Sequence, residues 1–552
     1  MFSLRIGLLA EGGFPFAAGE SPGWCDRLVR GLAHHEFDVF AFAVDAAQEA
    51  SGLVPLPPQV RAVHVAPLWR PAPGERRYGR AERRRFAEHF TELAGALAAG
   101  GAGEEPGRES GQDRFASGLY GLAELARDAG GPGRALRAEQ AVRILERACR
   151  APGAHPVVQG ARVAELLAVA GHLDRALRPL GAEWYGDGGT GLADADLCHA
   201  LSGGPAALPG LLARRFFGTP LLVTEYGVRL RRHYLESGRG AYAGGTVTVR
   251  ALVTAFHRRL AAEAYDKAAL VTPGNAHARR WALRLGAEGH RLRTVYPGMD
   301  AARFADVDDS PVSGDDRTLV WAGRIEPAGD LVGLLHAFAE IRREKPAARL
   351  VVAETGPPAA AHAGYRDHCR ALAAHLFPDE GADAHAVGAG PVSFEEIGDP
   401  VLPDRAAAYT TGGVAVLSSI VAGFPVGLVE AMLCGRATVS TDVGAVREVI
   451  GGTGLVVPPR NPRALADACL ALLRDPARRA RLGAAARARA VELFTAEQNV
   501  GAFGGIYLEL ASHGPARTAA RATPHPFAHP PEAYLAGAPA PDPGPVLKEA
   551  GR

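Results

Sequence analysis

Short apolar runs alternate with segments of helical apolar spacing through most of residues 1–300. Runs typical of buried strands lie at residues 4–10, 37–43 and 269–273, and in ADADLCHALSGG and TPLLVTEYG. Apolar residues at helical spacing occupy residues 24–32 and 247–265. Strands that alternate with helices favour a parallel, doubly wound sheet.

Gly- and Glu-rich sequence and two helical patterns interrupt this alternation, which predicts a helical insertion near residues 98–150. The segment PGMDAARFADVDDSPVSGDDR is rich in turn and acidic residues, as linkers between domains are. A second series of strands follows it, predicted at residues 318–323, 349–354, 413–418, 437–441 and 454–457.

The chain is therefore predicted to be α/β, with two Rossmann-like doubly wound domains facing a cleft. We expect an N-terminal domain over residues 1–300, a linker over 301–317 and a C-terminal domain over 318–512. The Pro/Ala-rich residues 513–552 are expected to be disordered.

Composition excludes several classes of protein. Lys and Arg number 61 and Asp and Glu 60, so a formal charge of +1 gives no reason to expect a nucleic-acid partner. Six cysteines without metal-binding spacing predict reduced thiols, no metal site and a cytoplasmic location. No apolar stretch is long enough to span a bilayer, and the N-terminal run does not continue as a signal peptide. Peripheral membrane contact remains open.

The most informative motif is SSIVAGFPVGLVEAMLCGRATVSTDVGAVREVI. A predicted strand ends in the turn Gly423, Phe424 and Pro425, and a helix opens at Val426. Free amides and the dipole at a helix N-terminus suit a phosphate, and Glu430 one turn later suits ribose hydroxyls. The glycine turn alone does not establish a phosphate site, because about half of such turns contain glycine only for backbone geometry.

This motif, continued by GLVVPPRNPRALADA and preceded by WAGRIEPAGDLVGLLHAF, resembles the donor-binding region of retaining glycosyltransferase family 4. LLAEGGFPFAAGESPGWCDRLVRGL and TPLLVTEYGVRLRRHYLES resemble the N-terminal domain of the PelF-like branch. The resemblance implies a GT-B fold and a metal-independent hexosyltransferase without a cofactor. It would transfer sugar from a nucleoside-diphosphate sugar, expected to be a UDP-sugar, to a glycan or lipid-linked acceptor with retention, as in polysaccharide biosynthesis.

The resemblance also implies roles for particular residues. Arg324 matches the arginine that stabilises the departing diphosphate, and Glu430 matches the ribose-binding glutamate. Gly329 stands at the position of the family lysine and Ala422 at that of the sugar-binding glutamate. Gly19, followed by Glu20, falls where the family often has two glycines.

Three residues are expected to point into the cleft on the acceptor side: His199, Glu225 and Tyr226. Arginines in residues 213–237 suit an anionic or lipid-phosphate acceptor. Since Gly329 and Ala422 replace two functional side chains, a second hypothesis stays open: a degenerate glycosyltransferase that acts as a non-catalytic partner or regulator. A dehydrogenase or epimerase is disfavoured because no G-x-G-x-x-G follows the first strand.

Overall fold

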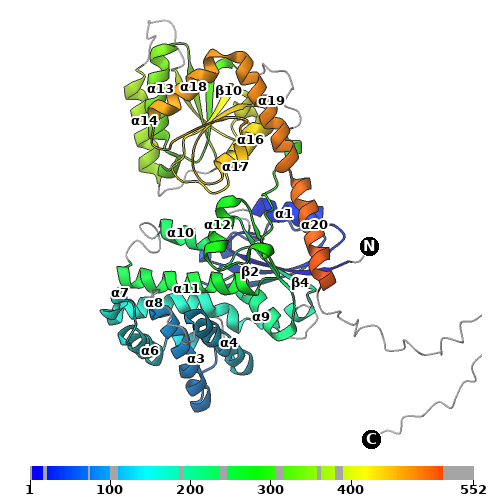
Figure 1. The fold of residues 1–552 in the computed structure, drawn as a ribbon, viewed down its shortest axis with the longest axis vertical. Helices are drawn as coiled ribbons and strands as arrows, with labels where there is room; N and C mark the ends of the chain where they lie inside the picture. The colour runs from blue at the N-terminus through cyan, green and yellow to red at the C-terminus, as the bar shows by residue number, and fades with distance from the viewer. Residues whose placement is uncertain are drawn as a thin grey trace, which may run out of the picture.

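The computed structural model describes residues 3–16, 22–71, 75–99, 110–185, 191–236, 245–304, 315–356, 362–378 and 390–513. Gly19, most of the predicted linker and residues 514–552 of the predicted tail lie outside these ranges. The described residues form two parallel six-stranded sheets, one in each half of the chain (Figure 1). The predicted fold class, two Rossmann-like domains, is confirmed.

The first sheet has the strand order β3-β2-β1-β4-β5-β6. The central pair is β1 and β4, in which Leu8 lies opposite His199. Strand order reverses direction at this pair, so the switch point of the sheet lies at the carboxyl ends of β1 and β4. Its strands are β1 (Arg5–Glu11), β2 (Glu36–Ala43), β3 (Val60–Pro67), β4 (Leu197–Ala200), β5 (Leu221–Glu225) and β6 (Leu270–Pro273).

Among the described residues, seven α-helices outside the inserted layer accompany this sheet along the chain. The side chains of β1 alternate between two apolar clusters, since Leu8 packs in one and Leu9 in the other. This alternation is what a strand covered on both faces requires. The helices are α1 (Pro22–Gly31), α2 (Ala46–Ala50), α9 (Ala207–Phe217), α10 (Arg229–Glu236), α11 (Val247–Lys267), α12 (Ala276–Arg284) and α20 (Ala496–His513).

A layer of helices lies between β3 and β4 in the chain and on the side of the first sheet away from the second (Figure 1). Buried aromatic side chains such as Phe86, Phe90 and Phe115 join it to the core of the sheet. It extends further at both ends than the predicted insertion at residues 98–150, because its apolar spacing continues on both sides. The helices are α3 (Arg80–Ala98), α4 (Gly111–Ala129), α5 (Gly133–Leu136), α6 (Glu139–Arg150), α7 (Pro156–Gln159) and α8 (Val163–Leu177).

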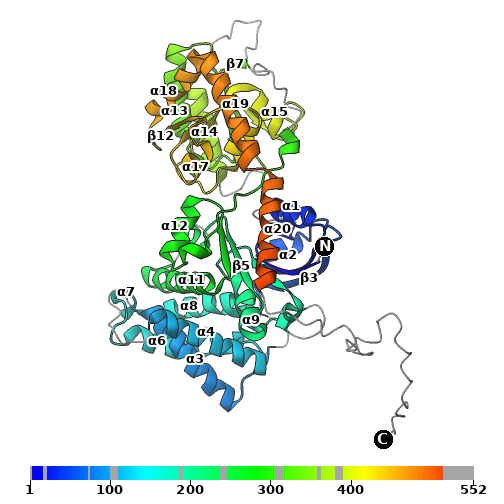
Figure 2. The ribbon, with the colours of Figure 1, turned by 45° about the vertical axis from the view of Figure 1, so that its right-hand side comes forward.

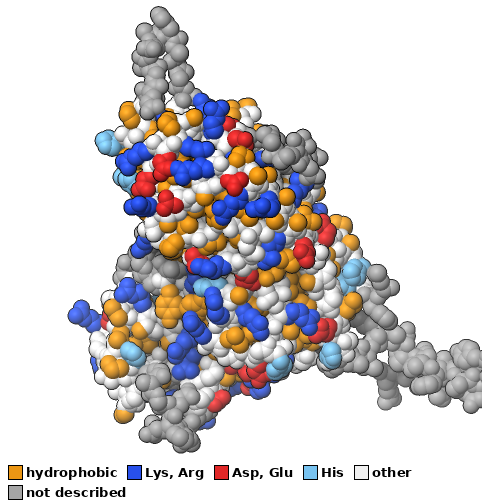
Figure 3. Space-filling view, turned by 45° about the horizontal axis from the view of Figure 1, so that its top comes forward, with side chains coloured by type: hydrophobic (Ala, Val, Ile, Leu, Met, Phe, Trp, Pro, Cys, Tyr) orange, Lys and Arg blue, Asp and Glu red, His pale blue; other side chains and the backbone are white. Residues whose placement is uncertain are grey.

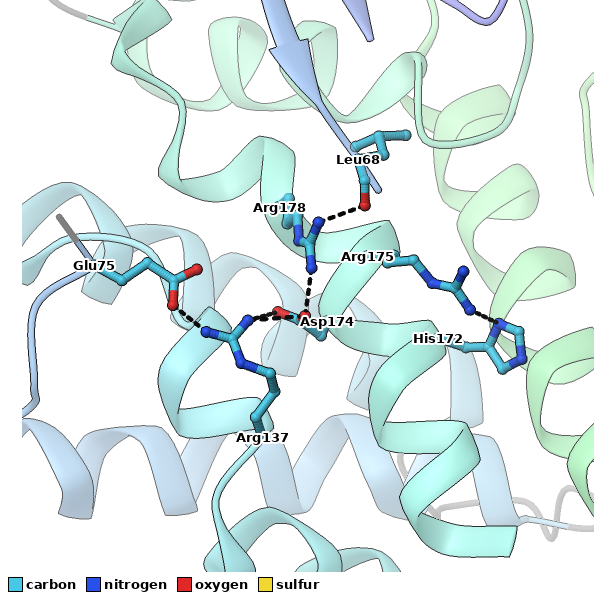
Figure 4. A network of polar contacts seen from close by, with 7 residues as sticks. All are labelled: Leu68, Glu75, Arg137, His172, Asp174, Arg175 and Arg178. Carbon is cyan, nitrogen blue, oxygen red and sulfur yellow. Dashed lines mark hydrogen bonds and ion pairs between the residues drawn. The ribbon is translucent and has the colours of Figure 1, made fainter. Parts of the chain in front are cut away.

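A buried carboxylate ties this layer to the sheet (Figure 4). Asp174 on α8 has a side chain only 4% exposed and accepts hydrogen bonds from Arg137 and Arg178. Arg137 also pairs with Glu75, and Arg178 donates to the carbonyl of Leu68, directly after β3. Because charged partners surround Asp174, its burial fixes the layer relative to β3.

The second sheet has the order β12-β11-β10-β7-β8-β9, with its switch point between β10 and β7. Its strands are β7 (Asp315–Gly323), β8 (Arg349–Glu354), β9 (Val392–Glu396), β10 (Gly412–Leu417), β11 (Ala437–Thr441) and β12 (Leu455–Val457). Its helices include α13 (Leu331–Glu344), α14 (Ala363–Leu376), α15 (Arg405–Thr410), α16 (Val426–Leu433), α17 (Val446–Ile450), α18 (Pro462–Arg474) and α19 (Pro476–Leu493).

The chain passes between the halves twice, and the two passages lie side by side. Met299 forms a β-bridge with Thr495, and the amide of Ala496 donates to the carbonyl of Met299. After this point α20 runs back along the first half, as Figure 2 shows. Its residues Phe503 and Tyr507 are fully buried in the core beneath β1 and β4. The C-terminal range predicted as 318–512 is thus wrong at its end, because the apolar face of α20 is buried on the first sheet.

Candidate functional site

The carboxyl ends of the two sheets face each other and touch. Arg231 on α10, in the first half, donates from Nη2 to the carbonyl of Ala422 in the second half at 3.0 Å. Glu448 on α17 accepts from the amide of Ala276 at 2.7 Å and from the hydroxyl of Tyr296 at 2.8 Å. The loops that follow β5 and β10 therefore lie at one interface between the halves.

The surface around this interface has no single sign of charge. Figure 3 shows basic and acidic side chains on both halves of the visible face. Within the described ranges, no group of three or more His, Cys, Asp and Glu side chains could hold a metal ion. In the same part of the chain, no helix has the length and apolar character needed to cross a bilayer. All six cysteines are buried and free.

The loops after β7 and β10 form one unit at the switch point of the second sheet. Ser418 donates from Oγ to the carbonyl of Gly329 at 2.6 Å and accepts from the indole of Trp321 at 3.1 Å. The amide of Ile420 donates to the carbonyl of Ala328 at 2.8 Å. The loop that carries Arg324 is therefore fixed against the loop that carries the Gly-Phe-Pro turn.

The Gly-Phe-Pro turn has the geometry predicted from the sequence. Helix α16 begins at Val426, whose side chain is exposed, and the space beside Gly423 is open. Behind the turn, the amide of Ala445 donates to the carbonyl of Gly423 at 3.1 Å. Gly444 has a φ of +56° there, and a Cβ on it would lie 2.4 Å from that carbonyl oxygen. Only glycine allows this close approach. Phe424 packs against Phe494.

Glu430 lies one turn into α16 and is buried, with only 8% of the residue exposed. Both of its carboxylate oxygens accept from Nη1 of Arg405 at 2.8 Å. Burial raises the pKa of the Glu430 carboxyl, and Arg405 opposes this rise. Since a carboxylate has about four lone-pair positions, the paired oxygens keep capacity for further donors such as ribose hydroxyls.

The two departures from the family pattern are part of the local packing. Gly329 is buried, and a Cβ on it would lie 3.2 Å from the ring of Trp321. A lysine at this position would therefore press on the indole. Ala422 is half-buried, and its carbonyl is the acceptor for Arg231. Arg324 itself is exposed and forms no ion pair with any other described residue.

Sequence reasoning missed cations that only the fold brings to this interface. Arg27 on α1 donates to the carbonyl of Gly298 at 2.7 Å, and burial lowers the pKa of its guanidinium. Burial also lowers the pKa of Arg231, which belongs to the arginine-rich segment 213–237 already noted in the sequence. Arg27 and Arg303 both lie close enough to Glu430 to favour its ionised form. Their common position could not be read from the sequence, because they come from elements far apart in the chain.

His199 does not point into an open cleft, so this prediction is wrong. The residue is 0% exposed on β4, and Tyr507 of α20 covers it. Its Nδ1 lies 2.8 Å from the hydroxyl of Tyr507, and its Nε2 lies 2.6 Å from that of Thr224. Burial lowers the pKa of His199 to about 3, so the ring is neutral. Its role here is structural.

Glu225 and Tyr226 also make internal contacts. Glu225 is 2% exposed, and its Oε2 accepts from the amide of Gly203 at 2.9 Å and from Tyr265 at 2.8 Å. It therefore positions the glycine turn after β4. Tyr226 accepts from Asn499 at 2.9 Å, and its ring centre lies 4.8 Å from that of Trp24. Burial raises the pKa of Tyr226.

Comparisons with known proteins agree with this arrangement. The family model described as "Domain of unknown function (DUF3492)" matches residues 4–290. The chain belongs to the DUF3492 family. In the second half, residues 316–475 match the family model "Glycosyl transferases group 1". The loops after β7 and β10 lie within this second match.

Two curated relatives are D-inositol 3-phosphate glycosyltransferases. The protein of Kineococcus radiotolerans is 32% identical over 249 residues, which cover 41% of this chain and 54% of the relative. That of Frankia alni is 33% identical over 218 residues, which cover 37% of this chain and 50% of the relative. The DUF3492 chain thus spans about half the length of these relatives.

Solved structures share the fold across both halves. Sucrose-phosphate synthase from Thermosynechococcus elongatus aligns with a TM-score of 0.52 and 18% identity, over 92% of this chain and 99% of that one. Anabaena HepE in complex with UDP aligns with a TM-score of 0.53 and 14% identity, over 92% and 100% of the two chains. The fold is therefore GT-B. The match to the family model "Glycosyl transferases group 1" covers most of its second half.

Proposed function

We propose that the protein is a retaining, metal-independent glycosyltransferase that transfers a sugar from a nucleoside-diphosphate sugar, with UDP as the preferred nucleotide. One observation carries the proposal: the Gly-Phe-Pro turn opens α16 at the switch point of the second sheet, beside the Arg324 loop and against the first half. The group 1 match over residues 316–475 and the UDP named with the HepE structure support it.

In this proposal the diphosphate binds at the N-terminus of α16, where amides and the helix dipole favour negative charge. Arg324 approaches it from the loop after β7. Arg231, which already touches Ala422, supplies a second cation from the first half. Arg231 would thus take over part of the task of the family lysine, whose position is Gly329 here.

During transfer, the bond between the anomeric carbon and the diphosphate breaks and a bond to an acceptor hydroxyl forms. The proton of that hydroxyl leaves with the diphosphate. Negative charge accumulates on the departing group, so fixed cations contribute most in the transition state. Loss of one such donor typically costs about 2.7 to 4 kcal/mol of barrier height.

Glu430 binds the ribose in this proposal, and Arg405 keeps its carboxylate ionised and oriented. We also propose that the protein acts in the cytoplasm, where its six buried thiols stay reduced. We propose that the acceptor is a glycan or a lipid-linked saccharide.

The test is a calorimetric titration with UDP, GDP and ADP, and with their glucose conjugates. We expect UDP to bind, and Glu430→Ala to weaken it by about 1.5 to 3 kcal/mol, as for hydrogen bonds to a charged group. Glu492→Ala, an exposed carboxylate on α19, is the matched control and should leave affinity unchanged. Absence of nucleotide binding by the wild type would refute the donor site.

A further inference from the structure

The first half has a polar group at its own switch point that the sequence patterns did not single out. Glu11 is the last residue of β1, and β1 pairs with β4 at the centre of the sheet. In open α/β sheets, ligands bind outside the carboxyl ends of the strands at this point. Glu11 therefore occupies, in the first sheet, the place that the donor loops occupy in the second.

Among the described residues, only one oxygen of the Glu11 carboxylate has a partner. Oε1 lies 2.9 Å from Nη2 of Arg229, and the Glu11 side chain is 4% exposed. Oε2 is buried and accepts no hydrogen bond from any described residue. A buried carboxylate oxygen without a donor is costly, so the site is complete only when a donor binds.

A glycine, Gly204, lies directly beside Oε2. A Cβ on Gly204 would lie 3.2 Å from Cγ of Arg229, 3.4 Å from Oγ of Ser202 and 3.5 Å from Oε2 of Glu11. The backbone of Gly204 does not have a left-handed φ, so its conformation does not require glycine. A methyl group there would contact Oε2 and press on the Arg229 side chain that holds the carboxylate. Glu225 holds the same turn through the amide of Gly203.

The arginine that fixes Glu11 follows a strained residue. Val228 has a φ of +42° and is buried, with 3% exposure. This backbone region is strained for a β-branched residue, and such strain concentrates at binding sites. Two residues beyond Arg229, Arg231 contacts Ala422 of the second half. One short helix thus links the Glu11 carboxylate to the donor loops.

We propose that Oε2 of Glu11 accepts a hydrogen bond from a hydroxyl of the acceptor, and that the acceptor is a neutral sugar rather than a phosphorylated one. The inference rests on the proposed glycosyltransferase function and deepens it. A hydroxyl supplies the donor that Oε2 lacks, whereas a phosphate placed there would meet a buried negative charge. Arg229 already compensates Glu11, so it leaves no net positive charge in the pair for an anion.

The experiment compares glucose and maltose with glucose 6-phosphate as acceptors, at saturating UDP-glucose. Two variants disturb the interaction in different ways: Glu11→Gln removes the charge, and Gly204→Ala places a methyl group against Oε2 and Arg229. Glu36→Gln is the matched control, because Glu36 pairs with Arg61 at the opposite end of the same sheet. The UDP affinity, by calorimetry, and the Tm, by thermal unfolding, are measured for each variant.

We expect the wild type to prefer the neutral sugars. For these, Glu11→Gln and Gly204→Ala should each raise the acceptor KM about 10- to 100-fold, as loss of a hydrogen bond to a charged group does. UDP affinity should stay within about twofold, because the donor loops are on the other sheet. Glu36→Gln should match the wild type in both measurements.

Two results would overturn the inference while leaving the proposed function intact. One is a preference of the UDP-binding wild type for glucose 6-phosphate. The other is an acceptor KM within twofold of wild type in both Glu11→Gln and Gly204→Ala, which would mean that Oε2 takes no part in acceptor binding. A wild type that binds no UDP and transfers no sugar would instead refute the proposed function, and this inference with it.

Discussion

Each half of the protein has a buried glutamate paired with an arginine near the carboxyl ends of its strands, and the two pairs differ in what they leave unsatisfied. In the second half, Arg405 contacts both oxygens of Glu430. In the first half, Arg229 contacts one oxygen of Glu11, and the other has no donor among the described residues. Two sheets with corresponding strand orders thus present different chemistry near their switch points.

The difference suggests that the two carboxylates have separate roles in ligand binding. A fully paired carboxylate is rigid and pre-organised for an extended ligand such as a nucleotide, and its charge is compensated before the ligand arrives. A carboxylate with one free oxygen requires a donor from the ligand itself. The neighbouring groups agree with this contrast, because the second half presents an open glycine turn whereas His199 and Tyr226 in the first half are internally bonded.

Breaking the Glu430 pair should have the largest effect on stability. Arg405→Met leaves a buried carboxylate without its cation. We expect a loss of about 2 to 3 kcal/mol in the free energy of unfolding, less than for a fully buried pair because 38% of the Arg405 side chain is exposed. Urea unfolding measures this free energy. The double change Arg405→Met with Glu430→Leu should recover most of the loss.

The pH dependence of this loss gives a second check. Burial already raises the pKa of Glu430, and without Arg405 it should rise further. The loss should therefore be largest above that pKa, where Glu430 is ionised, and shrink as the pH falls and a proton neutralises it. A loss that does not change with pH would show that Glu430 is not the group left unpaired.

The first half should be sensitive to acid, because burial lowers the pKa of His35 to about 4 and that of His199 to about 3. The pKa of His199 is about 3 in the fold, whereas the unfolded chain binds this proton near pH 6.5. Between these two pH values the unfolded state binds more protons than the folded state. The free energy of unfolding should therefore decrease as the pH is lowered, by up to about 1.4 kcal/mol per pH unit from His199.

His199→Gln should flatten this slope, as urea unfolding at a series of pH values would show. The exposed His336 on α13 provides the control in the second half. His336→Gln should leave the slope of the wild type unchanged. An equal slope in wild type and His199→Gln would contradict the assignment.

The proposed donor-binding role of the Gly-Phe-Pro turn can be tested without changing any residue proposed to bind the nucleotide. Gly444→Ala would place a Cβ 2.4 Å from the carbonyl oxygen of Gly423, at a φ of +56°. We expect the turn to shift and UDP affinity to fall about tenfold, since misplaced amides lose their hydrogen bonds. Gly452→Ala has a similar backbone penalty at φ +91° but open space around it, so UDP affinity should remain normal in the calorimeter.

The contact between the halves should give the smallest effect. Glu448→Gln removes the charge that accepts from the amide of Ala276 and the hydroxyl of Tyr296. Burial, together with Glu448, raises the pKa of Tyr296 to about 12, so this hydroxyl remains a donor. We expect a loss of at most about 1 kcal/mol. Small-angle scattering should show a wider separation of the halves with little change in Tm; a large drop in Tm would assign Glu448 to the core instead.

Strands with strong apolar patterns were predictable within a residue or two. The predicted strand at residues 37–43 is β2 (Glu36–Ala43), and that at 437–441 is β11 (Ala437–Thr441). Two strands were missed, β3 and β9. Both are edge strands with one neighbour, and their side chains are mostly half-buried, so their apolar signal is weak.

The sequence alone determined the two doubly wound sheets and the helix that opens at Val426, because periodicity and turn residues act over short distances along the chain. It did not determine which polar groups meet. Arg231 reaches Ala422 across 191 positions, and His199 lies beneath Tyr507 across 308. Contacts of this kind, between residues far apart in the chain, decide which side chains are buried and which polar atoms are paired. They also decide which atoms, such as Oε2 of Glu11, lack a partner among the described residues, so only the tertiary structure determined these features.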